Sequence, residues 1–161
     1  MLERILAMLL AMLSPFLPGG AKPTDAALAA FDYSQSASYF EGNYSYGARS
    51  DGEGLIAEYY LYCGNLEYSI PMTEADAAEL RAIIDRNDIW KWHGFDESSR
   101  LLLDGDGFSL YAGFEDGTEI SAHGYGLFPD GFGAASSQID ALFMEILERN
   151  GIDPEKDYYG E

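Results

Sequence analysis

The chain has 161 residues, of which 47% are hydrophobic and 14% aromatic, and its 28 Asp and Glu against 9 Lys and Arg leave a formal charge of -19 at pH 7. This composition is typical of one globular domain with a packed core and excludes a chain that is disordered for most of its length. So negative a charge repels nucleic-acid phosphates and anionic lipid headgroups, so any macromolecular partner is expected to be basic. The single cysteine, Cys63, excludes an internal disulfide framework and a multi-cysteine zinc site.

The first 21 residues differ in character from the rest of the chain. The run 5–17 carries no charge, and as a helix it would be about 20 Å long, too short for the roughly 30 Å hydrocarbon core of a bilayer. Arg4 precedes it and small residues follow it, an order typical of a secretory signal cleaved after Ala21. We therefore expect residues 1–21 to be a signal peptide or a membrane-associated helix, and the protein to be exported or to contact a membrane through residues 1–17. The alternatives are a helix packed on the domain and a cytoplasmic protein.

Residues 39–70 predict three antiparallel strands joined by tight turns. Segments 50–54 and 64–65 carry the turn residues, and Pro71 ends the last strand. Alternating apolar positions give one face of the middle strand, at Leu55, Ala57, Tyr59, Leu61 and Cys63.

Two amphipathic helices follow from the 3.6-residue period. The first begins after Thr73, a helix-capping residue followed by acidic residues in the first turn, and ends at Asn87. Its apolar stripe is Ala77, Leu80, Ile83 and Ile84. The second helix ends at Asn150-Gly151, and its stripe is Ile139, Leu142, Phe143, Ile146 and Leu147. The acidic tail from about residue 152 is expected to fray.

The order of these elements predicts the fold class. Segments 39–87 and 101–150 each run strand, turn, strand, helix, which raises the interpretation of a diverged duplication, although no residue-by-residue repeat supports it. We predict an α+β domain over residues 22–161, with an antiparallel sheet built from these two halves and two main helices packed on one face.

The segment LLLDGDGFSLYAGFEDGTEISAHG, residues 101–124, has the spacing of a calcium loop at first sight. With Asp104 at position 1, Asp106 stands at position 3 and Glu115 at position 12. Position 6 requires glycine for its sharp turn but holds Ser109, and the intervening apolar residues alternate as in a strand. The pattern therefore favours a β-hairpin over a calcium site.

The register of that hairpin follows from its apolar residues. A two-residue loop would put the apolar residues of the two strands on opposite faces. A three-residue loop over 115–117, with Gly117 in the left-handed conformation, brings them to one face. The predicted pairs are Phe114 with Thr118, Ala112 with Ile120 and Leu110 with Ala122.

The C-terminal half resembles a group of small bacterial proteins of unassigned function. The residues that carry the resemblance are Trp92-His93-Gly94-Phe95, Leu103-Asp104-Gly105, Asp116-Gly117-Thr118-Glu119-Ile120, Gly124 and Pro129 to Phe132. They are mostly turn residues and core aromatics. The resemblance implies a shared fold and no particular activity.

Residues for catalysis are few. The only histidines, His93 and His123, form no helical metal-binding pair, and no Gly-x-Ser-x-Gly motif surrounds a serine nucleophile. Cys63 has no basic neighbour in sequence and is interpreted as a core residue. The sequence thus predicts no metal and no cofactor, and it favours a non-enzymatic protein.

Two features remain as candidate binding surfaces. Trp90 and Trp92 would share one face of an extended strand, either in the core or as an aromatic platform beside Tyr125 and Phe128. Between Arg100 and Arg149 there are nine acidic residues and no Lys or Arg, a field that attracts cations unless it serves only solubility. The acidic residues chosen as binding candidates are Asp104, Asp106, Glu115, Asp116 and Glu119.

These features predict a binding or inhibitory module that engages a basic protein or peptide through the acidic C-terminal half. The alternative is a small hydrolase or carbohydrate-binding domain that uses the region of Trp92 and Tyr125. The sequence leaves the oligomeric state open.

Overall fold

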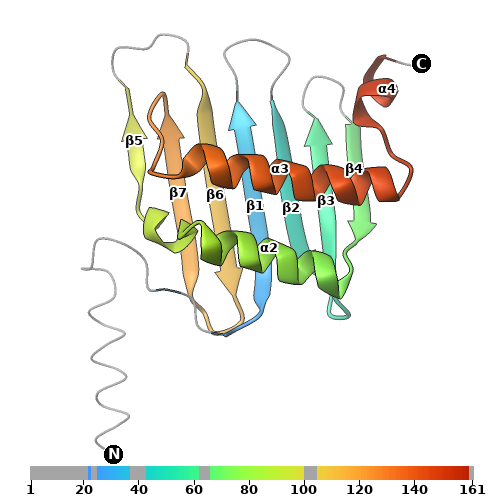
Figure 1. Cartoon of the computed structure of the whole chain (residues 1–161), viewed down its shortest axis with the longest axis horizontal. Coiled ribbons are helices and arrows are strands. Elements are labelled where there is room, and N and C mark those ends of the chain that lie inside the picture. Colours follow the sequence, from blue (N-terminus) through green and yellow to red (C-terminus); the bar gives the residue numbers. More distant parts are fainter. Residues whose placement is uncertain (1–21, 23–24, 37–42, 62–65, 100–104, 160–161) are drawn as a thin grey trace, which may run out of the picture.

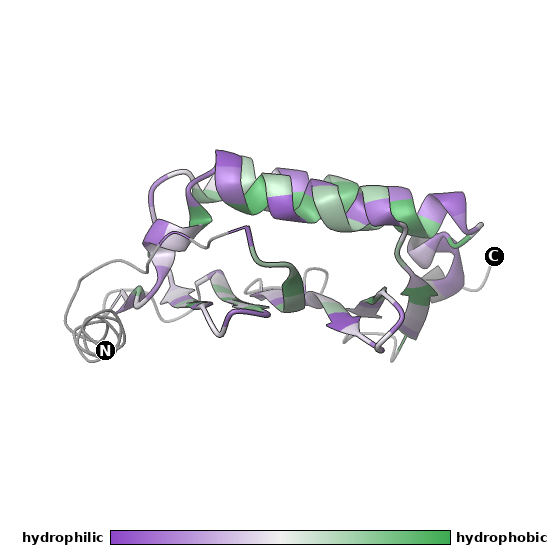
Figure 2. Cartoon of the chain, turned by 90° about the horizontal axis from the view of Figure 1, so that it is seen from below, coloured by the Kyte–Doolittle hydropathy of each residue, from purple (hydrophilic) through white to green (hydrophobic). Residues whose placement is uncertain are grey.

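The computed structural model describes residues 22, 25–36, 43–61, 66–99 and 105–159. The leader 1–21, Cys63 and Asp104 lie outside the described residues, so the predictions made for them stay predictions. Two long helices, α2 (Glu74–Arg86) and α3 (Phe132–Arg149), lie side by side across one β-sheet (Figure 1). In the edge-on view both helices lie on the same side of the sheet (Figure 2). The side without α2 and α3 is called the open face below.

Seven strands form the sheet in the order β4-β3-β2-β1-β6-β7-β5. Their bounds are β1 Leu28–Ser36, β2 Tyr44–Ser50, β3 Leu55–Leu61, β4 Leu66–Pro71, β5 Asp96–Ser98, β6 Gly107–Phe114 and β7 Glu119–Tyr125. Every neighbouring pair is antiparallel except β5 and β7, which run parallel. The predicted α+β class is confirmed, whereas the prediction of a purely antiparallel sheet is wrong because the sheet is mixed.

The route of the chain after α2 explains the parallel pair. The chain forms a short 3-10 helix, η2 (Ile89–Trp92), on the helix side, and Gly94, with φ of 81°, then turns it back toward the sheet. The Gly94 N–H donates to Ser121 O at 2.8 Å and the His123 N–H to Phe95 O at 2.8 Å. The chain therefore runs beside β7 in the same direction and forms β5, the parallel partner of β7. β5 has three residues, too few to show the alternation of apolar and polar residues from which a strand is predicted.

The central strand β1 joins the two halves of the sheet, and the sequence reasoning missed it. It pairs with β2 on one side and with β6 on the other. A register shift between Leu28 and Ala30 interrupts its apolar alternation, which resumes at Phe31 and Tyr33. The three strands predicted over 39–70 are confirmed as β2, β3 and β4.

The β6–β7 hairpin has the predicted register. Leu110 pairs with Ala122 and Ala112 with Ile120. The Phe114 N–H donates to Thr118 O at 2.9 Å, and Gly117 has a φ of 83°. The three-residue loop therefore places all the apolar side chains on the helix face of the sheet.

Both predicted helices are present, with the predicted ends. The Thr73 hydroxyl accepts from Asp76 N and the Asp76 carboxylate accepts from Thr73 N, a reciprocal capping box at the start of α2. Asn87 caps the C-terminus of α2, and α3 ends at Asn150 with Gly151 at φ 73°. The tail, for which fraying was predicted, contains a six-residue helix, α4 (Pro154–Tyr159).

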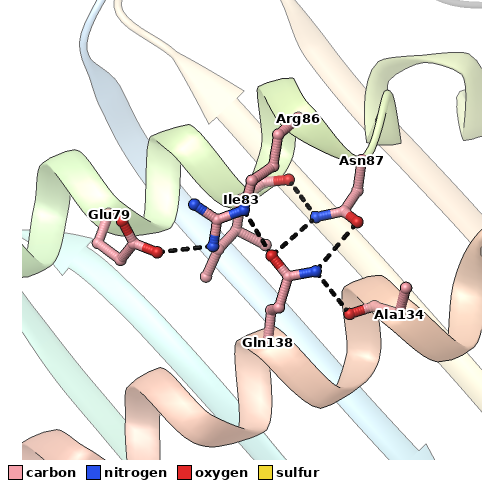
Figure 3. A network of polar contacts seen from close by, with 6 residues as sticks. All are labelled: Glu79, Ile83, Arg86, Asn87, Ala134 and Gln138. Atoms are coloured by element: carbon pink, nitrogen blue, oxygen red, sulfur yellow. Dashed lines mark hydrogen bonds and ion pairs between the residues drawn. The ribbon is translucent and has the colours of Figure 1, made fainter.

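A polar network between the C-terminal end of α2 and the N-terminal part of α3 sets their relative position (Figure 3). Gln138 and Asn87 exchange two amide hydrogen bonds, of 3.2 and 3.3 Å. Gln138 also donates to Ala134 O at 2.9 Å and accepts from Arg86, which in turn pairs with Glu79 at 2.6 Å. Because an amide both donates and accepts, this network fixes the register between the helices as well as their contact.

The core lies between the helices and the sheet. The Phe143 ring of α3 stacks on Tyr46 of β2 at 4.6 Å between centroids and on Phe31 of β1 at 6.2 Å. Ile139 and Ile146 of α3 are fully or almost fully buried beside them. One face of each helix is thus buried against the sheet and is not available to a ligand.

Candidate functional site

A cavity of about 650 Å³ opens at the end of the sheet where β1 begins and where the β2–β3 and β6–β7 turns lie. One face of α2, from Glu74 to Asp85, forms its other wall. Five carboxylates and one cation line this acidic cleft: Asp25, Glu53, Glu74, Asp85, Glu115 and Arg81. The cleft therefore combines a concave shape with a strongly negative lining.

The β2–β3 turn brings Glu53 to the cleft. The Asp51 carboxylate accepts from the backbone N–H groups of Glu53 at 2.8 Å and Gly54 at 2.9 Å, and Gly52 takes a φ of 92°. The hydrogen bond from the Glu53 N–H has the larger effect and that from the Gly54 N–H the smaller, and together they hold the pKa of Asp51 below its usual value. Asp51 thus adds a stable negative charge beside the cleft and fixes the turn that carries Glu53.

The β6–β7 turn brings Glu115 to the same place. The Glu115 N–H donates to Ala27 O at 3.0 Å, which ties the turn to the segment before β1. On the next residue the Asp116 carboxylate accepts from Thr118 N at 2.8 Å. The turn geometry that the sequence predicted is therefore what positions Glu115.

Arg81 is the single cation that lines the cleft, and its guanidinium interacts with groups of the cleft wall. It donates to Ala26 O at 2.5 Å and to Asp85 Oδ2 at 3.1 Å, and its guanidinium lies 4.8 Å from the centre of the Phe114 ring. The second carboxylate oxygen of Asp85 is buried and has no hydrogen-bond partner among the described residues. Leaving a buried acceptor without a donor costs free energy, so this oxygen is an unfavourable feature of the cleft wall.

The other described cations that form ion pairs are also engaged elsewhere. Their partners lie on the open face, along the helices or in the tail, in the pairs Arg49 with Asp32 and Glu58, Arg86 with Glu79, Lys91 with Asp88, Arg149 with Asp76, and Lys156 with Asp153. None of these cations lines the cleft. The carboxylates of the cleft therefore keep most of their negative field.

The structure brings only part of the predicted acidic set together. Glu115 lines the cleft, and Asp116 and Glu119 are exposed on the same hairpin beside it. Asp106 precedes β6 and so lies at the opposite end of that strand, eight residues long, from Glu115. Asp104 lies outside the described residues. Of the predicted set, Glu115, Asp116 and Glu119 thus lie at the end of the sheet where the cleft opens, and Asp106 lies at the opposite end.

Four acidic residues of the cleft were missed by the sequence reasoning, namely Asp25, Glu53, Glu74 and Asp85. They come from a loop, a turn and two positions on α2, and only the folded sheet makes them neighbours. The turn residues around Glu53 could have indicated its place near Glu115. In an antiparallel sheet successive strands alternate in direction, so every second turn lies at the same end of the sheet.

The predicted aromatic candidates do not share a surface. Trp92 is 4% exposed, packs against Phe108 and Phe132 on the helix side, and donates from Nε1 to Asp130 O at 3.1 Å. Tyr125 lies on the open face, where its hydroxyl accepts from Gly105 N at 2.9 Å. The extended strand predicted for Trp90 and Trp92 is instead the 3-10 helix η2. The alternative that joined Trp92 to Tyr125 therefore has no common site.

One row on the open face has the residue types of a hydrolytic triad. Strand pairing aligns Ser109 with His123, and His123 with Asp96, and His123 Nδ1 lies 3.5 Å from Asp96 Oδ1. The His123 and Asp96 side chains are 58% and 85% exposed. Water at this exposure screens the carboxylate that would orient and charge the histidine, so the row lacks the dry environment that activates a serine.

A second cluster of titratable groups lies beneath α3. Burial raises the pKa of Asp140, and hydrogen bonds from Tyr44 and Tyr46 offset part of this rise. Burial also raises the pKa of Tyr33 to about 12, and the Tyr33 hydroxyl donates to Ser136 at 2.9 Å. These groups satisfy one another inside the core, so we interpret the cluster as structural.

Within the described ranges, no group of three or more His, Cys, Asp and Glu residues is arranged to hold a metal ion. No helix among these residues is both long and apolar enough to cross a membrane. No protein-family model and no curated protein matches the chain.

Proposed function

We propose that the protein is a binding module that holds a basic segment of a partner protein or peptide in the acidic cleft. The observation that carries the proposal is the lining itself, five carboxylates around a cavity of about 650 Å³ with one cation that is already engaged. A Lys or Arg side chain supplies both the charge and the hydrogen-bond donors that such a lining lacks. The exposed carboxylates of Glu53, Glu74 and Glu115 are the acceptors that such donors can reach directly.

Electrostatic attraction to a negative cleft acts mainly on the rate of encounter. Association with a lysine-rich peptide is therefore expected to slow steeply as ionic strength rises through about 0.15 M, where the Debye length is about 8 Å, while dissociation changes much less. Stopped-flow kinetics over a salt series measures both rates.

Replacing Glu53, Glu74 and Glu115 together with glutamine is expected to reduce the association rate about tenfold and to leave the fold intact. All three side chains are exposed, and none makes a side-chain hydrogen bond or ion pair within the described residues. The measurement is the association rate with the lysine-rich peptide at low salt.

A matched variant separates the cleft from net charge. Replacing the exposed residues Glu67, Glu97 and Glu145 with glutamine changes the net charge by the same amount, but none of the three lines the cleft. We expect this control to associate at nearly the wild-type rate. Equal slowing in both triple variants would refute the cleft and leave only a general effect of an acidic surface.

A further inference from the structure

A second cavity, of about 600 Å³, lies between η2 and the residues that lead into α3. Its volume falls within the roughly 300–1,000 Å³ of pockets that bind small ligands. Its walls are the side chains of Trp92, Phe95 and Phe128, and its charged rim is Asp88, Lys91 and Asp130. These six residues are called the aromatic pocket below. An apolar wall with a few polar groups at the rim is the composition that binding pockets share.

The pocket coincides with an exposed apolar patch. Phe128 is 39% exposed and its neighbour Leu127 is 41% exposed. Phe128 is held in place by Phe132, at 4.6 Å between ring centroids, and by Phe108 at 5.7 Å. A large apolar surface that is rigid and exposed gains free energy when another apolar group covers it.

The rim carries one uncompensated charge. Asp88 and Lys91 form an ion pair at 2.6 Å and largely neutralise each other. Asp130 is fixed at the rim because its main-chain oxygen accepts from Trp92 Nε1 at 3.1 Å, and its carboxylate has no hydrogen bond or ion pair within the described part of the chain. The aromatic faces also attract cations. The matching group is therefore an aromatic ring with a positive charge beside it.

The aromatic pocket adjoins the acidic cleft along the chain. Asp85 lines the cleft, whereas Asn87 and Asp88 line the pocket. Consecutive Cα atoms are about 3.8 Å apart, so Asp85 and Asp88 lie within about 11 Å of each other, and an extended peptide covers roughly 3.3 Å per residue. One peptide can thus reach both sites with an aromatic residue a few positions from a basic one.

We propose that the aromatic pocket binds an aromatic side chain of the same partner segment whose basic residues occupy the acidic cleft. The partner motif is then an aromatic residue flanked by Lys or Arg. The inference rests on the proposed function, because the basic residues bring the segment to the cleft and the aromatic residue anchors it. Charge determines the rate of encounter, and the aromatic ring determines how long the complex lasts.

Three synthetic peptides test the pocket separately from the cleft. The first alternates lysine and glycine around one phenylalanine, the second replaces that phenylalanine with alanine, and the third keeps it but replaces lysine with glutamine. We expect the Kd of the first peptide to be at least about tenfold lower than that of the second, because the first peptide dissociates more slowly. The third is expected to bind far more weakly than the first.

Two variants test whether Phe128 is the cause of the higher affinity for the phenylalanine peptide. In Phe128→Ser the ratio of the two Kd values is expected to fall to about one, while the alanine peptide keeps its wild-type affinity. Tyr111→Ser is the matched control, because Tyr111 is 37% exposed and belongs to β6 on the open face. It is expected to keep the full ratio.

A measurement on the wild-type protein does not depend on how well Phe128→Ser folds. The NMR signal of the Trp92 indole N–H, at the pocket wall, is expected to shift with the phenylalanine peptide and to stay in place with the alanine peptide. Equal affinities of these two peptides, with no Trp92 shift, would overturn the aromatic pocket and leave the cleft standing. Failure of both lysine peptides to bind would overturn the proposed function and this inference with it.

Discussion

Replacing Gly124 with alanine is expected to reduce the free energy of unfolding by about 3 kcal/mol. A Cβ at this position would lie 2.3 Å from Leu127 O and 2.5 Å from Phe108 Cε1. The first atom belongs to the backbone and the second to a ring that is 3% exposed, so neither can turn aside cheaply. The loop that carries Leu127 and Phe128 would have to move away from β7. Chemical denaturation of the purified variant measures the loss.

Gly113→Ala is the control for this prediction. A Cβ at Gly113, on β6, would lie 2.9 Å from the hydroxyl oxygen of Tyr111, the far end of a side chain that is 37% exposed and can rotate. We expect a change within about 1 kcal/mol, because alanine also lowers the entropy of the unfolded chain. Equal losses at Gly113 and Gly124 would show that close approach of the Leu127 loop is not the cause.

Replacing Asp76 with alanine is expected to cost about 3 kcal/mol at pH 7. The Asp76 side chain is 6% exposed, pairs with Arg149 of α3 at 2.6 Å and accepts from Thr73 N at 2.8 Å. The variant loses a helix cap and the link between the start of α2 and the end of α3. Glu79→Ala on the same helix is the control, because Glu79 also has an arginine at 2.6 Å but is 47% exposed. It is expected to cost less than about 1 kcal/mol.

The effect at Asp76 is expected to depend on pH. Burial acts to raise the pKa of Asp76, but hydrogen bonds from Arg149 and Thr73 outweigh it and hold the pKa below its ordinary value of 3.8. A carboxyl group with a lowered folded pKa stabilises the fold above its unfolded pKa, and this contribution is lost as the pH falls through the folded value. The difference between the wild type and Asp76→Ala is therefore full at pH 7 and shrinks below pH 3.8. A constant difference from pH 7 to pH 3 would contradict this origin.

Elements with an unbroken period could be predicted from the sequence. The stripe of α3, the capping residue Thr73 and the apolar alternation of β6 each specify local structure without help from the rest of the chain. The loop register at Gly117 followed because a shift of one residue would have turned every apolar side chain to the other face.

The missed elements depend on tertiary contacts. The shift between Leu28 and Ala30 breaks the alternation of β1, and the packing of its neighbours β2 and β6 on both sides maintains the strand. The parallel strand β5 exists because Gly94 returns the chain beside β7. Trp92 lies in η2 rather than in a strand for the same reason, since the chain turns on the helix side before it reaches the sheet.

The sequence indicated an acidic surface but not which residues compose the acidic cleft. Of the acidic residues chosen as binding candidates from the sequence, Glu115 lines the cleft. Asp106 and Glu115 are close in sequence, yet an intervening strand of eight residues separates them in space. Asp25 and Asp85 are distant in sequence, yet both line the cleft, because the segment before β1 carries Asp25 there and α2 carries Asp85.

NMR of the isotopically labelled protein can map where a lysine-rich peptide binds. We expect the amide signals of residues 52–54, in the β2–β3 turn, and of Ala77 and Ala78, on the wall formed by α2, to move together as the peptide is added. Their shifts should weaken as salt is raised. Movement confined to the open face, around Ser109 and His123, or no movement anywhere at low salt, would contradict the assignment of the acidic cleft as the binding site.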